Sequence, residues 1–441
     1  MRPSKRIDGG NAIGVVMQAG RHGGTCPSSE RRVRRAPAGG LAAVENGRIY
    51  GKGMNAARQR CERGLLKGVG SLNPKVLAMA VIAAAVVWAV GFVFVPRAKQ
   101  DALFYANGQD LMSDYRMPRT CAAASDPYRA EAIEQKDRCY AALGYVVASA
   151  FPRDTIRGGI VFNVVGAGLF LLAAGLLMRR LGAEQWLILG TVALSAPFLY
   201  NIERANQVWL AGAGVMVFLA WFESESRWKR LAALAALAAA AALKITPGIF
   251  ALLLLKNRRW KDLVLLSVLG LALLILPFFC YDGFESFQEW RGCLQEHAQY
   301  YSTLKGWGFV KFARTGLLRL RGVEMELQSA LYYATAGLDL LMGLAAVWAF
   351  FRAKDRRMEI WAIGLALVLL PAVSQYYTAL YLVPAFLLLA GRRLSLPEAF
   401  LWFLLLCPLQ FPASTTSLNR LIANFAVLGM VVNMVKYTAK G

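Results

Sequence analysis

The stretch VLAMAVIAAAVVWAVGFVFV, from Val76 to Val95, decides the fold because it runs for 20 residues without a charged side chain. A helix of that length crosses a hydrocarbon core about 30 Å thick. The segment before it is polar, and residues 1–75 carry 15 Lys and Arg against 4 Asp and Glu. The chain therefore enters a membrane after a basic tail.

The composition extends this interpretation to the whole chain. Of its 441 residues 57% are hydrophobic, with a mean hydropathy of +0.42, which exceeds what the core of a soluble domain requires. The net charge of +23 would suit a nucleic-acid partner, but outside the tail the basic residues fall largely in short clusters between apolar runs, which is typical of cytoplasmic loops. The charge therefore indicates topology, and no nucleic-acid partner is expected. The clusters are Arg179-Arg180, Arg227 to Arg230, Lys256 to Arg259, Arg352 to Arg357 and Arg392-Arg393.

Ten further apolar regions follow the first. They cover residues 158–178, 186–200, 208–222, 231–255, 263–280, 329–351, 360–373, 379–390, 399–411 and 421–435. The region at 231–255 is interrupted by Lys244-Ile245-Thr246-Pro247-Gly248 and has basic residues on both flanks, which favours two half-helices over one crossing. The sequence predicts an all-α, polytopic membrane protein of about ten to twelve transmembrane helices. We expect the protein in the inner (plasma) membrane, and the positive-inside rule places both termini in the cytoplasm.

Two parts of the chain lie outside this pattern. Residues 1–70 are rich in Gly, Arg and Ala without apolar periodicity, so we expect a disordered segment before a membrane domain at residues 76–436, with Met54 as an alternative start.

Two polar stretches, 96–157 and 281–328, are too long for turns and fall on the outer, periplasmic side. Because that side is oxidising, Cys121 can pair with Cys139, and Cys280 with Cys293, although unpaired thiols fit equally well.

Ionisable groups gather at the outer ends of the predicted spans. They are Asp101, Asp110, Asp114, Arg153, Asp154, Arg157, Glu203 and Arg204. Inside the spans the main acid is Asp339, for which we expect a cation partner or a water-exposed position near the outer end of its helix. This distribution indicates a site at the membrane surface rather than a pathway through the membrane.

Several short motifs carry a family resemblance. They are Asp101-Ala-Leu-Phe-Tyr105, Gly108, Asp110-Leu111, Ser125-Asp126-Pro127-Tyr128, Ala205-Asn206-Gln207-Val208, Ala242 to Pro247, Lys256 to Trp260, Ser374-Gln375-Tyr376-Tyr377, Leu382 and Pro384. In order and spacing they resemble glycosyltransferase family 87, which comprises polyprenyl-phosphate-mannose-dependent mannosyltransferases of the multi-span GT-C type. The resemblance covers residues 76–435. The chain departs from the family at Gln375 to Tyr377, where a histidine is frequent, and at Ala205-Asn206, where glycine is common, which leaves the sugar open.

The resemblance implies a role for Asp101. Such enzymes place one acid of the first outer loop beside the anomeric carbon of a lipid-linked sugar, and by motif that acid is Asp101. The acceptor hydroxyl attacks C1 while the polyprenyl phosphate leaves, so a carboxylate must take the proton, and direct displacement inverts the configuration. The alternative role for Asp101 is to cap or solvate the end of the first span.

Fixed cations are needed where the leaving phosphate gains charge. Arg204 and Lys244 are the leading candidates, since a guanidinium binds two phosphate oxygens at once and Lys244 stands at the break between two half-helices. The alternative role of Arg204 is to pair with Glu203 or another loop acid. The alternative role of Lys244 is to snorkel to a lipid headgroup. Arg153 and Arg157 are further candidates for the phosphate or the acceptor, with anchoring to anionic lipid as the alternative.

The remaining candidate residues would bind the substrates. They are Tyr105, Asp110, Gln207, Tyr376 and Tyr377, and for the last two an interfacial aromatic belt is the alternative. No metal and no cofactor is expected, because the chain has only His22 and His297 and no acidic triplet with ligand spacing.

The expected function is a membrane glycosyltransferase. It would move one hexose, mannose first, from a polyprenyl-phosphate donor to a glycan or glycolipid acceptor on the outer face, with membrane lipid as its surroundings. Two alternatives remain: a transporter or flippase of lipid-linked sugars, and a transferase of the same fold that uses glucose, arabinose or an aminosugar.

Overall fold

A computed structural model describes residues 71–94, 111–130, 133–179, 181–302, 307–310, 325–371, 373–389, 392–409 and 416–439. Within them the chain is almost wholly helical, and its one sheet is a short antiparallel pair in which Ser71 faces Ser395 and Leu72 faces Leu394. The predicted all-α membrane architecture is confirmed. Asp101, Tyr105, Asp110 and the segment up to residue 70 lie outside the described residues.

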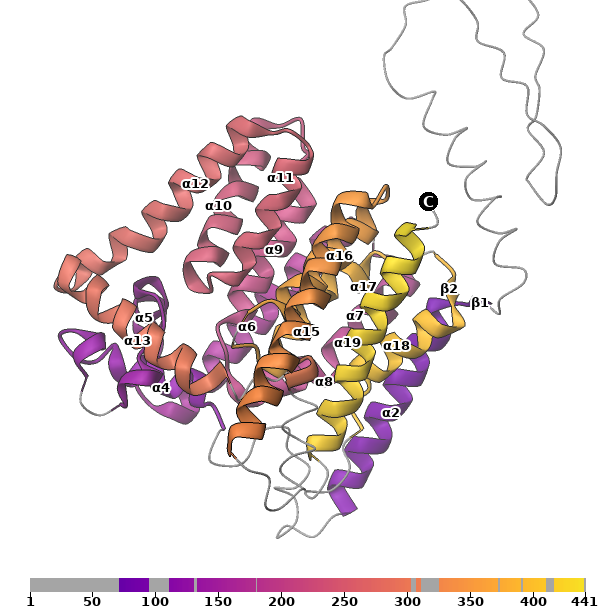
Figure 1. Cartoon of the computed structure of the whole chain (residues 1–441), viewed down its shortest axis with the longest axis horizontal. Coiled ribbons are helices and arrows are strands. Elements are labelled where there is room, and N and C mark those ends of the chain that lie inside the picture. The colour runs from indigo at the N-terminus through magenta and orange to yellow at the C-terminus, as the bar shows by residue number, and fades with distance from the viewer. Residues whose placement is uncertain are drawn as a thin grey trace, which may run out of the picture. The chain divides into compact units, whose positions relative to one another are not determined.

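The elements follow one another in the order shown in Figure 1. The α-helices are α2 (Pro74–Phe94), α4 (Ser113–Cys121), α5 (Ala142–Ser149), α6 (Thr155–Met178), α7 (Ala183–Ala193), α8 (Ala196–Arg204), α9 (Val208–Trp221), α10 (Arg227–Leu243), α11 (Leu252–Lys256), α12 (Trp260–Ile275), α13 (Phe284–Ser302), α15 (Met325–Arg352), α16 (Arg356–Leu369), α17 (Val383–Leu387), α18 (Leu396–Leu406) and α19 (Thr416–Ala439). The 3₁₀ helices are η4 (Pro127–Arg129), η5 (Gln135–Asp137), η6 (Thr246–Ala251), η7 (Leu276–Cys280) and η8 (Tyr376–Leu382), and the strands are β1 (Ser71–Leu72) and β2 (Leu394–Ser395).

Two helices, α9 and α16, form the centre of the core because they are apolar and buried on nearly all sides. Helix α9 packs against α6 and α10, and small residues allow the close approach. A Cβ on Gly212 would lie 2.7 Å from the ring of Phe170, and one on Gly166 would lie 2.8 Å from Trp209. These contacts fix α6 and α9 against each other.

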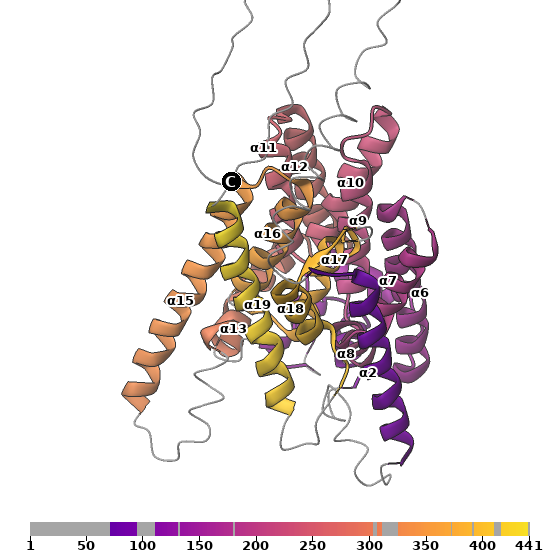
Figure 2. The ribbon, with the colours of Figure 1, turned by 90° about the vertical axis from the view of Figure 1, so that its right-hand side faces the viewer.

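The outer helices leave broad apolar faces uncovered. In α12 only Leu266 is buried, whereas Val264, Val268 and Leu271 are mostly exposed, and in α6 the same is true of Leu172. Exposed apolar faces of this extent are expected where lipid is the solvent. Figure 2 shows α15 and α6 on opposite sides of the bundle, so uncovered apolar helices flank it on both sides.

Fewer of the described helices reach the length of a full span than the apolar runs suggest. Among the described residues, Thr155–Met178, Trp260–Cys280, Ala330–Arg352 and Leu421–Ala439 are long and apolar enough to cross a membrane. Helices α7 and α8, bent by 49° at their junction, can supply a fifth span. Other runs form shorter helices because Pro371, Pro384 and Pro397 stand where helices end or begin.

One end of the bundle is basic, and we call it the basic end. There Lys256 binds Glu359 at 2.9 Å, Arg357 binds Glu398 at 3.2 Å, and the Arg259 guanidinium donates to the carbonyl of Phe222. Phe222 precedes α10 and Arg259 follows α11, so the chain descends through α10, breaks at residues 244–251 and returns to the same end. The two basic flanks predict this path.

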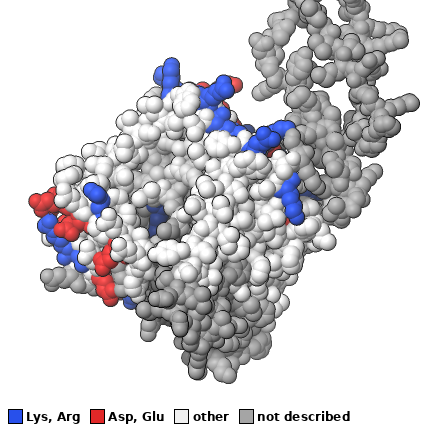
Figure 3. All heavy atoms as spheres, in the orientation of Figure 1, with Lys and Arg blue, Asp and Glu red and all other residues white. Residues whose placement is uncertain are grey.

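The opposite end, which we call the loop end, is formed by α4, α5 and α13. Helix α13 packs against η4 and η5, and the Ser286 hydroxyl donates to the Asp126 carboxylate at 2.9 Å. Figure 3 shows charged side chains gathered at these two ends, with an almost uncharged band between them on this face. That distribution fits a bundle that spans a membrane.

The structure bears on the outer cysteines and on Asp339. Cys121, Cys139, Cys280 and Cys293 are free thiols, which is one of the two alternatives left open by the sequence, and Cys121 and Cys293 are buried in one apolar cluster of the loop end. Asp339 is not water-exposed: it is 1% exposed, and its carboxylate accepts from the backbone amides of Phe309 and Val310. These two hydrogen bonds hold residues 307–310 against α15.

Candidate active site

Helix α4 brings a carboxylate into the bundle at the loop end. Asp114 lies in the first turn of α4 and is 6% exposed. The helix follows Met112, whose backbone has a φ of 52° and whose amide donates to the carbonyl of Glu203 at 2.6 Å. The start of α4 is thereby fixed against the end of α8, and Asp114 faces the residues that follow it.

Asp114 accepts three hydrogen bonds from the last residue of α8 and the turn that follows it. Arg204 donates from Nε to Oδ2 at 3.0 Å and from Nη2 to Oδ1 at 2.8 Å, and the Asn206 amide donates to Oδ2 at 2.8 Å. Between them Ala205 adopts a left-handed conformation with a φ of 52°, which turns both neighbours toward Asp114. Glycine adopts this conformation most easily, which gives a physical reason for the glycine expected near this position.

The electrostatics of this pair favour the ionised acid. Burial raises the pKa of the Asp114 carboxyl, but the charge and hydrogen bonds of Arg204, the charge of Lys244 and the Asn206 amide outweigh burial. The pKa of Asp114 therefore lies below its ordinary value. Because a carboxylate with a lowered pKa and three donors holds its proton weakly, Asp114 is better suited to hold Arg204 than to act as a base.

Lys244 is the second cation at this site. It follows the last residue of α10, and its ammonium lies 4.7 Å from the ring centre of Tyr140 and 5.9 Å from that of Tyr377. Aromatic faces attract a desolvated cation, so the rings hold the ammonium without neutralising it. Figure 3 shows a hollow in the face of the bundle beside the lower end of α10, with Lys or Arg atoms at its floor.

Aromatic rings form one side of this site. Tyr377 stacks on Tyr200 with ring centres 6.0 Å apart, Tyr376 meets Tyr200 edge-on at 5.7 Å, and Trp307 stacks on Tyr376 at 5.2 Å. The Trp307 indole also donates to the carbonyl of Gln375 at 2.8 Å. Because these rings pack on each other inside the bundle, they do not form the interfacial belt that was the alternative for Tyr376 and Tyr377.

We call the group of Asp114, Arg204, Asn206, Lys244 and Tyr377 the Asp114 cluster. With Lys244 protonated, the two cations and one anion among these five residues give a net charge of +1. An environment of this kind binds an anion, since the ionised Asp114 fixes Arg204 but leaves one positive charge in excess.

The structure brings some of the predicted site residues together and separates others. Arg204, Lys244 and Tyr377 meet in the cluster, and Gln207 lies beside it, where its amide donates to the carbonyl of Gly144 at 2.9 Å. Arg153 instead lines a separate pocket. Arg157 is exposed in the first turn of α6 and lies in neither place.

Sequence reasoning missed several residues of this site. Asp114 was one acid among many in the outer loop, and Asn206 was only part of a motif. Tyr140, Tyr200 and Trp307 lie in separate segments and carried no local signal. The left-handed turn at Ala205 was signalled only by the expected glycine.

The described fold and the Asp114 cluster define a helical membrane protein with a group of charged and aromatic side chains at one end. The family model of glycosyltransferase family 87 matches residues 140–374, more than half of the chain. The chain belongs to glycosyltransferase family 87 and is a membrane glycosyltransferase. The match includes Tyr140, Arg204, Asn206 and Lys244, whereas Asp114 precedes it. No curated protein and no solved structure matches the chain.

Proposed function

We propose that this glycosyltransferase moves one hexose, mannose first, from a polyprenyl phosphate to a glycan or glycolipid acceptor on the outer face of the inner membrane. The observation that carries the proposal is the meeting of Arg204 and Lys244 around Asp114 in a lipid-facing bundle. A sugar linked to a lipid phosphate is the donor whose leaving group combines an anion with a membrane-soluble tail.

The cations would act on the leaving phosphate. Negative charge grows on that phosphate as the bond to the sugar breaks, and cations fixed in a dry site stabilise it without reorganisation. Arg204 is fixed by two hydrogen bonds to Asp114, and Lys244 by two aromatic rings. Asp114 is therefore a positioning residue in this scheme, and Arg204 and Lys244 bind the donor.

The base is a different carboxylate. Asp114 is a poor proton acceptor for the reasons given above, so the proposal keeps Asp101 as the general base. The acceptor oxygen forms the new bond to C1 while the bond from C1 to the phosphate oxygen breaks. Asp101 takes the hydroxyl proton, the bond electrons stay on the polyprenyl phosphate, and the anomeric configuration inverts.

Charge and aromatic residues support the remaining parts of the proposal. The positive-inside rule assigns the basic end to the cytoplasm, so the loop end and the Asp114 cluster face outward. The rings of Tyr140 and Tyr377 offer flat apolar surfaces for a hexose or an isoprenoid. Mannose as the sugar rests on the family resemblance alone.

Sugar transfer by the purified full-length protein in nanodiscs tests the proposal. Polyprenyl phosphates carrying mannose, glucose, arabinose or an aminosugar would be supplied with a glycan acceptor, and products would be read by mass spectrometry. Asp101→Asn should abolish transfer in a folded protein. Asp282→Asn, the same change at an exposed carboxylate of the loop end, should transfer normally. Full transfer by Asp101→Asn would refute Asp101 as the base, and movement of an intact donor between leaflets without transfer would support a flippase.

A further inference from the structure

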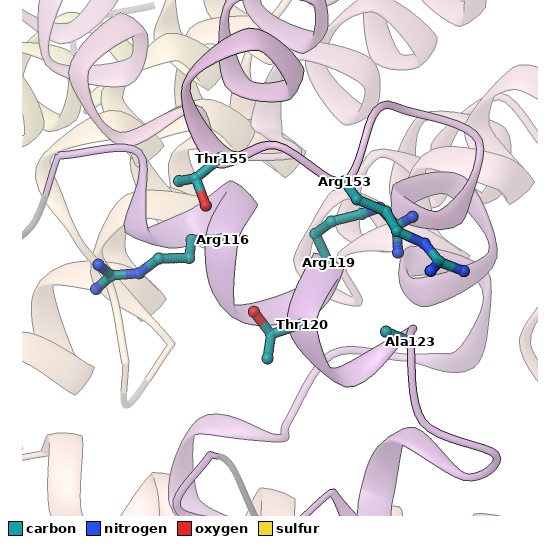
Figure 4. A pocket seen from close by; sticks show the side chains of 6 residues that line it. All are labelled: Arg116, Arg119, Thr120, Ala123, Arg153 and Thr155. Carbon is teal, nitrogen blue, oxygen red and sulfur yellow. The ribbon is translucent and has the colours of Figure 1, made fainter.

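A second basic site lies at the loop end, apart from the Asp114 cluster. It is a pocket of about 220 Å³ lined by Arg116, Arg119, Thr120, Ala123, Arg153 and Thr155. Figure 4 shows the side chains of Arg119 and Arg153 extending in the same direction in this view, whereas Arg116 points away from them. Because these residues come from α4, from the turn after α5 and from the start of α6, the pocket joins three segments of the chain.

The pocket concentrates positive charge. Among the described residues, no ion pair joins Arg116, Arg119 or Arg153 to a carboxylate. Arg119 is only 9% exposed, and its Nε donates to the carbonyl of Phe151 at 3.1 Å, which fixes the guanidinium in place. Guanidinium groups that line one small cavity repel each other unless an anion lies among them. The arrangement therefore favours a bound anion with several acceptor oxygens.

The position of the pocket identifies the chemistry of that anion. Thr155 begins α6, a helix long and apolar enough to cross a membrane, so the pocket lies at the depth of the lipid headgroups. Arginine pairs with phosphate through two parallel hydrogen bonds, and the hydroxyls of Thr120 and Thr155 line the same cavity. Asp154 caps the first turn of α6 by accepting from the amide of Arg157 at 2.6 Å.

We propose that this pocket binds a phosphate group through Arg119 and Arg153, at the outward-facing boundary of the membrane. The shared chemistry is a negatively charged phosphate, and its two sources are the headgroup of an anionic phospholipid and free phosphate. Arg116 adds a further positive charge to the lining of the pocket. The inference rests on the pocket alone and stands whether or not the proposed donor chemistry is correct.

Native mass spectrometry of the full-length protein in detergent micelles tests this site. The probes are short-chain phosphatidylglycerol, short-chain phosphatidylcholine and inorganic phosphate. The parent should bind phosphatidylglycerol at least about tenfold more tightly than phosphatidylcholine, whose choline group is repelled by the arginines. Arg153→Gln should weaken phosphatidylglycerol binding by about tenfold, and the double variant Arg119→Gln/Arg153→Gln should abolish it.

Controls separate the pocket from general attraction to a basic surface. Arg291→Gln removes the same charge from an exposed position in α13, outside the pocket, and should leave binding unchanged. Arg153→Lys should keep part of the binding. Arg119 is buried, so the single change at exposed Arg153 serves if the double variant does not fold.

Competition identifies the source of the phosphate. Phosphatidylglycerol binding that resists millimolar inorganic phosphate would assign the pocket to a lipid headgroup, and displacement by it would assign the pocket to free phosphate. Equal binding by the parent and Arg153→Gln, or equal loss in Arg153→Gln and Arg291→Gln, would overturn the proposal.

Discussion

Asp114→Asn and Arg204→Gln, made singly and together, measure the ion pair on which the candidate site is built. The side chains of Asp114 and Arg204 are 8% and 16% exposed, so either single change leaves a charge with little water around it. Removing one partner of a buried pair costs about 3–5 kcal/mol. Asparagine keeps one acceptor oxygen, so Asp114→Asn should lower the free energy of unfolding by an amount near the lower end of this range, about 3 kcal/mol.

The double variant should lose less than the sum of the single variants. Two neutral amides at these positions can hydrogen-bond to each other and leave no buried charge on this pair. We expect a coupling energy of about 2 kcal/mol. Residues Gly70–Gly441 form one compact unit. For a unit of that length, a loss of about 3 kcal/mol in the free energy of unfolding lowers the thermal unfolding midpoint by roughly 4 °C.

Thermal unfolding followed by tryptophan fluorescence in detergent measures these shifts. The matched control is the cycle of Arg129→Gln and Asp282→Asn, an ion pair of 3.2 Å at the same end with side chains 46% and 53% exposed. Its coupling energy should stay below about 1 kcal/mol because water screens it. Additive losses at Asp114 and Arg204, or a coupling energy no larger than the control, would refute the structural role given to this pair.

Three further predictions follow from the same structure. The pKa of Asp114 in the folded protein lies below its ordinary value. The ionised carboxylate therefore stabilises the fold at every pH above the pKa of an aspartate in the unfolded chain, about 3.9, and this contribution is lost as the pH falls further. The unfolding midpoint of the parent should therefore fall more steeply below pH 4 than that of Asp114→Asn, and equal slopes would contradict this. Lys244→Gln should lower turnover by about 100-fold, with Lys244→Arg less affected, in transfer assays at saturating donor, and unchanged turnover would exclude Lys244 from the reaction. Gly308→Ala should destabilise the fold by about 2 kcal/mol or more, because Gly308 has a φ of 87° and a methyl group there would overlap the Asp339 carboxylate. An unchanged midpoint in thermal unfolding would contradict the packing of Gly308 against Asp339.

Much of the membrane architecture is predictable because apolar runs and charges act locally. The first run, from Val76 to Val95, becomes α2, and the break at residues 244–248 follows from the basic residues on both sides of it. Residues 379–390 were predicted as a span but form part of η8 and the short helix α17. Apolar composition does not distinguish a segment buried in the bundle from one that crosses lipid, and Pro384 limits the helix.

The candidate site was predictable in its cations but not in their arrangement. Arg204 and Lys244 stand at sequence positions that indicate phosphate binding, whereas the partner of Arg204, Asp114, is 90 residues away and had no local signal. The free thiols show the same limit: Cys121 and Cys293 share an apolar cluster that only tertiary packing creates. Contacts between distant segments depend on how the helices pack.

The release of polyprenyl phosphate during sugar transfer tests the central proposal most directly. Purified parent protein, supplied with polyprenyl-phosphate mannose and an acceptor, should release one polyprenyl phosphate for each mannosylated acceptor, both quantified by mass spectrometry. Release without mannosylated product, or no consumption of any donor by a folded and inserted parent, would contradict the proposal that this site transfers a sugar from a lipid phosphate.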